Sequence, residues 1–394
     1  MLALTLALAL AATPGDVVEL KDGSKVEGRV VYDGPKRVVV LNGSREREIE
    51  RSKVASVKSA ANDLAAVLAE VPRIGLEDTA KLLELASRCR ALGLEGEAKL
   101  LAYSVLGIDP ASAAAHELCG HEMRGEKWTV REDGKKFTFD KLQEVRKDFG
   151  NAWIFHTTHF ELRTNLPLRR ASAIALELEL HYRAFFDAIG RELELYEVVE
   201  PMKAQVHAES GSYPEVSSRT GYFSAGDNTL YVLEQGGATA GVIAHEATHQ
   251  MLYNTAVKTK GGRGAIPQWF NEGFAEYMAA SRSGAEGRAS YSLGARHERH
   301  FAVHRDAKKP YDFSRVLTFE AEDFSASSKA DLKYAQAYTL VHFCLHGQGE
   351  LHRRGFFEFL RGAYLGRSSM TDFKDALAIK EREFEPTWHE YVRR

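Results

Sequence analysis

The sequence predicts an α+β protein built from three successive parts, and three observations support this prediction. Short β-branched runs separated by turn residues fill residues 16–58, and apolar residues then recur with a helical period over 61–122. From about residue 140, strands and helices alternate before helices dominate. A length of 394 residues accommodates two or three domains.

The composition excludes several classes of protein. Hydrophobic residues make up 44% and charged residues 27% of the chain, which is typical of globular domains. A formal net charge of -3 gives no reason to expect a nucleic-acid partner. The three cysteines form no Cys-x-x-Cys pair, so a disulfide scaffold is not expected.

Residues 1–14 are predicted to be a signal peptide. Their apolar run, MLALTLALALAA, is shorter than the ~20 residues that span a bilayer, and Ala9-Leu10-Ala11 fits a cleavage site. No Lys or Arg precedes the run, so a misplaced start or a hydrophobic N-terminal helix stays open. We expect an exported protein, periplasmic or extracellular, without a transmembrane span.

Residues 15–60 are predicted to form a small SH3-like or Sm-like β-barrel. Five short strand-like runs alternate with turn pairs such as Asp22-Gly23 and Asn42-Gly43. Nothing in the module indicates catalysis, and a protein partner for it is possible by fold analogy alone.

Residues 61–128 are predicted to form a tetratricopeptide-like helical segment, followed by a linker over 129–150. Leu64, Val67, Leu68 and Val71 follow the spacing of one helix face, but too few repeats are present for a solenoid. The polar stretch around Asp133-Gly134 favours the linker.

The third part, residues 151–394, is predicted as one α+β domain. The expected strands are 153–164, 202–207, 222–225 and 229–233. The expected helices are 170–190, 239–254, 268–282, 293–305, 332–346, 352–364 and 371–379.

The strongest chemical signal is His245-Glu246-Ala247-Thr248-His249. Histidines four residues apart share one face of a helix, where two imidazoles can bind one Zn²⁺. Glu246 follows the first histidine, so its carboxylate can reach a water on the metal. The pattern therefore predicts a zinc site with Glu246 as general base.

A catalytic zinc ion takes a third protein ligand, which distinguishes the families. Leu252 and Thr255 stand where a metzincin would need Gly and His, so that branch is excluded. Downstream, PQWFNEGFAEY places Glu272 and Glu276 one helical turn apart. Glu272 can ligate the metal while Glu276 accepts a hydrogen bond from a ligand histidine.

Together, the first motif and the segment NEGFAE at 271–276 resemble the gluzincin metallopeptidases. The similarity is to the peptidase MA-like domain of uncharacterised exported bacterial proteins and, distantly, to the aminopeptidase N family. It covers roughly residues 150–394 and implies a thermolysin-like domain, a small mixed sheet plus a helical subdomain. It also implies that Glu272 is the third zinc ligand.

The resemblance extends weakly to Tyr334, which would open a helix and donate to the oxyanion. Tyr338, one turn later, is the alternative donor, and simple core packing of both tyrosines stays open. The chain lacks the Gly-x-Met-Glu-Asn segment of the aminopeptidases, so an exopeptidase is not predicted. The hairpin at 221–233 is the nearest candidate for a strand that lines the substrate.

Other histidine clusters are expected to be structural. His116 and His121 are five residues apart, off a common helix face. His297, His300 and His304 lie among charged residues, which favours a solvated helix face.

The predicted function is hydrolysis of peptide bonds in a peptide or protein substrate, with Zn²⁺ as cofactor. The alternative is a catalytically silent zinc-binding scaffold with a peptidase-like fold, and a third possibility is a zinc hydrolase acting on another amide.

Overall fold

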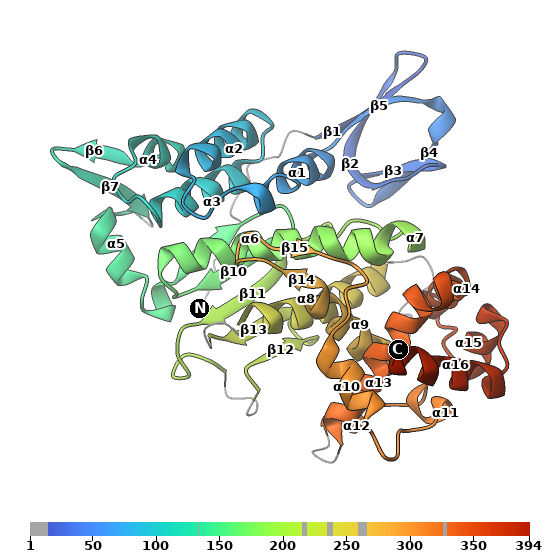
Figure 1. Ribbon diagram of the computed structural model, residues 1–394. Coiled ribbons are helices and arrows are strands. Elements are labelled where there is room, and N and C mark those ends of the chain that lie inside the picture. Colours follow the sequence, from blue (N-terminus) through green and yellow to red (C-terminus); the bar gives the residue numbers. More distant parts are fainter. Residues whose placement is uncertain (1–14, 133, 215–218, 235–238, 259–265, 326–328) are drawn as a thin grey trace, which may run out of the picture. The chain divides into compact units, whose positions relative to one another are not determined.

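The computed structural model describes residues 15–132, 134–214, 219–234, 239–258, 266–325 and 329–394 (Figure 1). The predicted signal peptide at 1–14 lies outside them. The chain divides into two compact units. One comprises the residues up to Glu144 with Phe155–Thr158, and the other comprises Val145–Ile154 with His159–Arg394.

The first unit begins with an antiparallel sheet in the order β4-β3-β2-β1-β5. Its strands are β1 Asp16–Leu20, β2 Lys25–Asp33, β3 Arg37–Asn42, β4 Arg45–Glu50 and β5 Val54–Lys58. Buried valines and Ile49 form its core. The predicted five strands are present, but among the described residues β4 and β5 are edges and the expected closed barrel does not form. Five of the six residues of β4, all except Ile49, are exposed and charged, which suits an edge strand.

Four helices follow in the predicted helical segment: α1 Ala60–Leu68, α2 Thr79–Ala91, α3 Glu95–Leu106 and α4 Ala113–Cys119. The expected linker at 129–150 instead holds regular structure. It contains most of a three-stranded sheet, β6 Glu122–Arg124, β7 Lys127–Glu132 and β8 Lys135–Thr138, and the helix α5 Phe139–Val145. Polar composition concealed these elements, because only Val130, Phe139 and Leu142 among them bury apolar side chains.

A five-stranded sheet in the order β12-β13-β11-β10-β9 lies in the second unit except for the last two residues of β9. Its strands are β9 Trp153–His156, β10 Phe160–Thr164, β11 Met202–His207, β12 Gly221–Ser224 and β13 Thr229–Leu233. Strands β10, β11 and β13 are parallel, and β12 runs antiparallel to β13 at the edge. The helix α6 Leu168–Phe185 packs on β10, and α8 Thr239–Lys258 packs on β12 and β13.

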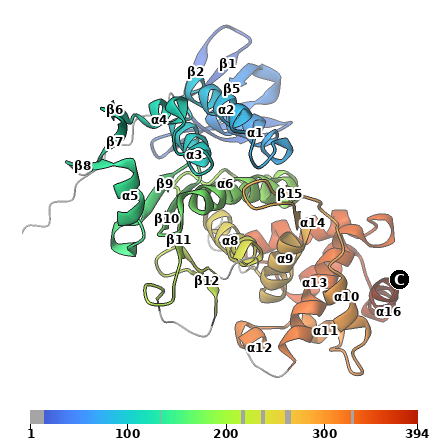
Figure 2. The ribbon, with the colours of Figure 1, turned by 60° about the vertical axis from the view of Figure 1, so that its left-hand side comes forward.

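Helices fill the rest of the second unit (Figure 2). They are α7 Arg191–Leu193, α9 Gln268–Ser281, α10 Glu298–Arg305, α11 Phe313–Val316, α12 Ala321–Ser325, α13 Ala330–His346, α14 Arg353–Tyr364, α15 Met370–Leu377 and α16 Glu381–Arg393, with the small hairpin β14 Arg282–Ser283 and β15 Ser290–Tyr291 after α9. The chain is therefore a mixed α+β protein with an N-terminal antiparallel sheet and a helical C-terminal region. No helix of the described residues has the length and apolarity needed to cross a membrane.

The helices α8, α9 and α13 form the frame that carries the predicted site. Helix α9 contacts both α8 and α13. Gly273 permits the close approach of α13, because a Cβ at this position would lie 2.5 Å from the carbonyl oxygen of Ala337. A side chain there would push against backbone, so glycine lets α9 and α13 pack in contact.

Candidate metal centre

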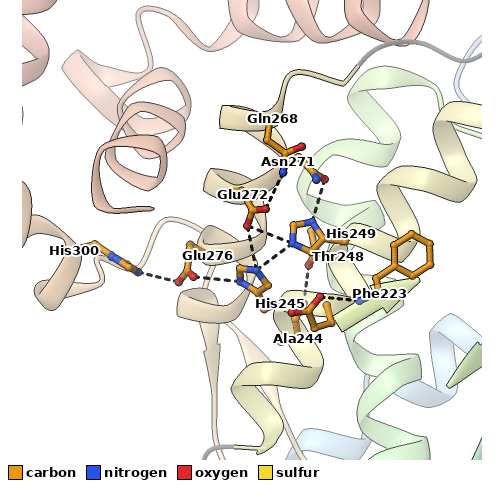
Figure 3. Close-up of polar contacts among 11 residues, drawn as sticks. Phe223, Ala244, His245, Thr248, His249, Gln268, Asn271, Glu272, Glu276 and His300 are labelled. Carbon is orange, nitrogen blue, oxygen red and sulfur yellow. Dashed lines mark hydrogen bonds and ion pairs between the residues drawn. The ribbon is translucent and has the colours of Figure 1, made fainter. Parts of the chain in front are cut away.

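His245 and His249 lie one turn apart on α8 with their rings directed at the same point (Figure 3). Their Nε2 atoms are 3.1 Å apart. The intervening Ala247 and Thr248 are fully buried. Thr248 Oγ1 donates to the carbonyl of Ala244 and accepts from His181 Nε2 at 2.9 Å, which fixes this side of α8 against α6. Core packing thus turns the two histidines toward α9.

Glu272 on α9 completes a group of three ligand atoms. Its Oε2 lies 3.4 Å from His245 Nε2 and 3.5 Å from His249 Nε2. One ligand atom from each of the three residues lies within 4.8 Å of the others, a grouping that could hold a metal ion. Two imidazoles and one carboxylate are a donor set found in catalytic zinc sites.

The outer nitrogen of each ring supports this assignment. His245 Nδ1 lies 3.2 Å from Glu276 Oε1, and His249 Nδ1 lies 3.0 Å from Asn271 Oδ1. Both partner oxygens accept hydrogen bonds, so both Nδ1 atoms carry protons. The Nε2 lone pairs then face each other and the carboxylate of Glu272. Three electron-rich atoms in this arrangement require a proton or a metal cation among them, so these residues fit a zinc ion.

The charges of the site follow from these contacts. Burial opposes ionisation of Glu272, but His249 and His245 outweigh burial and hold the pKa of this carboxyl well below its usual range. Burial likewise opposes ionisation of Glu276, and hydrogen bonds with His245 and His300 hold its pKa well below the usual range. Burial alone would lower the pKa of His245, yet Glu272 and Glu276 raise it. The two ionised carboxylates therefore favour a cation beside them, either a proton on the imidazoles or a metal ion.

Glu246 is not one of the three residues whose ligand atoms converge. Its Oε2 accepts a hydrogen bond of 3.1 Å from the backbone N–H of Phe223 on the edge strand β12. Gly221 makes this approach possible, because a Cβ there would lie 2.3 Å from Val242 Cγ1 on α8. The carboxylate of Glu246 is thus held by β12, which is an edge strand of the sheet among the described residues.

The hairpin that carries β12 is anchored on α8. Gln250 Nε2 donates to the carbonyls of Lys203 and Asn228 at 3.0 and 2.9 Å. The side-chain amides of Asn228 and Asn254 bond to each other in both directions. These contacts fix the position of β12 relative to the helix of the metal ligands.

The two candidate tyrosines differ in their surroundings. The ring centroid of Tyr334 lies 6.4 Å from that of His245, and its other side meets Phe324. Burial and the charges of Glu272 and Glu276 raise the pKa of Tyr334, so its hydroxyl keeps its proton. Tyr338 is fully buried, and its hydroxyl accepts from His297 N and donates to the carbonyl of Ala295. The hydroxyl of Tyr338 is thus engaged by backbone groups, whereas the ring of Tyr334 lies beside His245.

Three side chains of the site had no role in the prediction from sequence. Asn271 orients His249, and Gln268 donates to Glu272 Oε1 at 2.8 Å. His300 on α10 bonds Glu276 Oε2 at 2.9 Å. Asn271 stands beside a predicted ligand and Gln268 one turn before it, so their sequence positions could have indicated both. His300 carried no such signal.

The expectation that His297, His300 and His304 form a solvated helix face is wrong. His304 is buried, with its Nδ1 2.8 Å from Thr339 Oγ1. His300 is half-buried against Tyr338, with ring centroids 5.0 Å apart. The charged neighbours Glu298 and Arg299 face solvent, while the histidines face α13.

No curated protein matches the chain. Residues 239–363, which include all the site residues on α8, α9, α10 and α13, match the model of a family described as "Protein of unknown function (DUF1570)". This segment is therefore similar to an uncharacterised family whose description states no activity.

Proposed function

We propose that the protein is a zinc-dependent hydrolase of peptide bonds with a gluzincin-type site. One observation carries the proposal: His245, His249 and Glu272 converge, while Glu246 stands beside them without joining the ligand group. A site that only stores or binds zinc has no need of a separate carboxylate at this place. The resemblance of both helix motifs to gluzincins supports the same conclusion.

Zinc held by His245, His249 and Glu272 would polarise the substrate carbonyl and lower the pKa of water toward ~7. Glu246 takes a proton from the attacking water and passes it to the leaving amine. The backbone N–H of Phe223 keeps the Glu246 carboxylate oriented during this transfer. Tyr334 donates its hydroxyl proton in a hydrogen bond to the oxyanion that forms on the carbonyl.

Substrate binding at the edge of the sheet fits this chemistry. Strand β12 is an edge of the second unit's sheet, and its outward backbone groups can pair with an extended peptide. Such a peptide would run past Glu246, because the same strand contacts this residue. We therefore propose that the substrate is an extended peptide segment.

The test is Glu246→Gln, which keeps size and removes the base. We expect zinc content to stay unchanged and hydrolysis of a mixed peptide library to fall by about 10² to 10⁴-fold. Glu84→Gln, an exposed position on α2, is the matched control and should keep wild-type activity. Wild-type activity in Glu246→Gln would refute the base assignment.

Results on the wild type decide among the alternatives. Bound zinc without cleavage of any peptide would favour a silent scaffold. Cleavage of other amides but no peptide would favour a non-peptidase hydrolase.

A further inference from the structure

His300 bonds Glu276, the residue whose carboxylate orients the proposed metal ligand His245. The carboxylate of Glu276 bridges two imidazoles, with Oε1 3.2 Å from His245 Nδ1 and Oε2 2.9 Å from His300 Nε2 (Figure 3). All three residues have limited solvent access, with exposed side-chain fractions of 12–23%. A metal ion bound at the site would therefore be linked to His300 through His245 and Glu276.

The direction of each hydrogen bond follows from the bridging carboxylate. An ionised carboxylate only accepts hydrogen bonds, so His245 Nδ1 and His300 Nε2 both carry the protons that face it. Each bond takes a different oxygen of Glu276. Without the donor on His300, Oε2 would lose this partner, and the carboxylate could rotate about its last torsion away from His245.

The surrounding frame holds His300 in this position. Helix α10 is fixed by the buried Phe301 and by His304, which bonds Thr339 on α13. The ring of His300 packs between His297 and Tyr338, with centroid distances of 4.4 and 5.0 Å. The backbone N–H of His297 is itself bonded to the Tyr338 hydroxyl. Helix α10 therefore holds the Nε2–H group of His300 in a fixed position facing Glu276.

We propose that His300 is a positioning residue for the metal centre, which acts through Glu276 to fix the ring orientation and tautomer of His245. This inference rests on the proposed zinc site and extends it to α10. Loss of a group that orients a metal ligand commonly weakens metal affinity by about 10 to 100-fold. His300 acts one contact further away, and we expect its removal to weaken zinc binding about tenfold or slightly less.

The experiment measures the zinc dissociation constant of the full chain by competition with a chelator. Five proteins are compared: wild type, His300→Leu, His300→Gln, Glu276→Leu and the double variant His300→Leu/Glu276→Leu. His300→Gln retains an N–H donor and should bind zinc nearly as the wild type does. His300→Leu should bind about tenfold more weakly. In the Glu276→Leu background, His300→Leu should cause no further loss, because its effect passes through Glu276.

His304→Leu is the control for general damage to α10, since His304 lies on the same helix but bonds Thr339 instead of Glu276. It should leave zinc affinity unchanged even if it lowers the melting temperature. Any of three results would overturn the inference. His300→Leu could bind zinc as tightly as the wild type, or His300→Gln could lose as much zinc affinity as His300→Leu. The losses of zinc affinity could also add up in the double variant. If the wild type itself binds no zinc, the proposed metal site fails and this inference fails with it. A zinc-binding wild type with an insensitive His300 refutes the positioning role alone.

Discussion

Two pairs of histidines in close contact, one in each unit, differ in whether their surroundings suit a metal ion. In the second unit, His245 and His249 approach through Nε2 atoms 3.1 Å apart. In the first unit, His116 and His121 approach through Nδ1 atoms 2.7 Å apart. The two contacts are similar in distance, so distance between imidazoles does not distinguish the pairs.

The partners of the outer nitrogens do distinguish them. His116 Nε2 donates to the carbonyl of Pro110, and Tyr103 lies 3.5 Å from His121 Nε2. Hydrogen bonds run from Tyr103 through His121 and His116 to the carbonyl of Pro110. Both rings can be neutral in this arrangement, because each has one nitrogen that donates and one that accepts. Trp128 and Phe139 pack on these rings, and the partners of the outer nitrogens are a tyrosine hydroxyl and a backbone carbonyl. We infer that carboxylates, and not histidine spacing alone, give the other pair its proposed metal-binding character.

The largest expected difference between the pairs concerns zinc content. His249→Phe removes a ligand and should reduce bound zinc from about one equivalent to none. His121→Phe should leave zinc content unchanged and lower the stability of the first unit by about 1–3 kcal/mol, because a buried hydrogen-bond partner is lost. Metal analysis of both purified variants checks this. Equal zinc loss in the two variants would contradict the comparison.

A smaller effect is expected when an orienting partner is removed. Asn271→Leu deletes the acceptor for His249 Nδ1 and should weaken zinc binding about tenfold. Asn254→Leu, which breaks buried hydrogen bonds further along α8, should reduce stability without changing zinc affinity. Chelator competition measures both constants. Unchanged affinity in Asn271→Leu would show that this contact does not prepare the ligand.

The smallest expected effect is a pH dependence in the first unit. Burial, together with His116 and Lys99, lowers the pKa of His121 to about 4, against about 6.5 in an unfolded chain. Between these values the unfolded chain binds more protons, so the free energy of unfolding falls as pH drops from about 6.5 to about 4. In metal-free protein, His121→Leu should lose less stability than the wild type over this range. Chemical denaturation at both ends measures it, and equal losses would refute the assignment.

Local patterns in the sequence predicted the elements of the site. The ends of α8, α9, α13, α14 and α15 lie within two residues of the predicted ends in most cases. His245, His249, Glu272 and Glu276 lie on two such helices, so their shared faces followed from helical spacing. The structure brings Glu276 to His245, as predicted.

Features that depend on distant contacts were not predictable in this way. His300 reaches Glu276 only because α10 packs on α13, and no spacing in the sequence indicates this. The partner of Glu246 is the backbone N–H of Phe223, which carries no side-chain signature. Barrel closure depends on how the two ends of a sheet meet, and the strand pattern of residues 15–60 does not specify it. Helix α16 contains Pro386 in its interior, which made its sequence a poor helix candidate.

We propose that carboxylate charge makes the His245 and His249 pair a zinc site. Glu272→Gln tests it most directly, because the substitution keeps the shape of the side chain and removes its charge. Zinc content should be measured on wild type and variant after equal dialysis, with circular dichroism as the check on folding. We expect about one equivalent of zinc in the wild type and little or none in the folded variant. Undiminished zinc in Glu272→Gln would contradict this proposal.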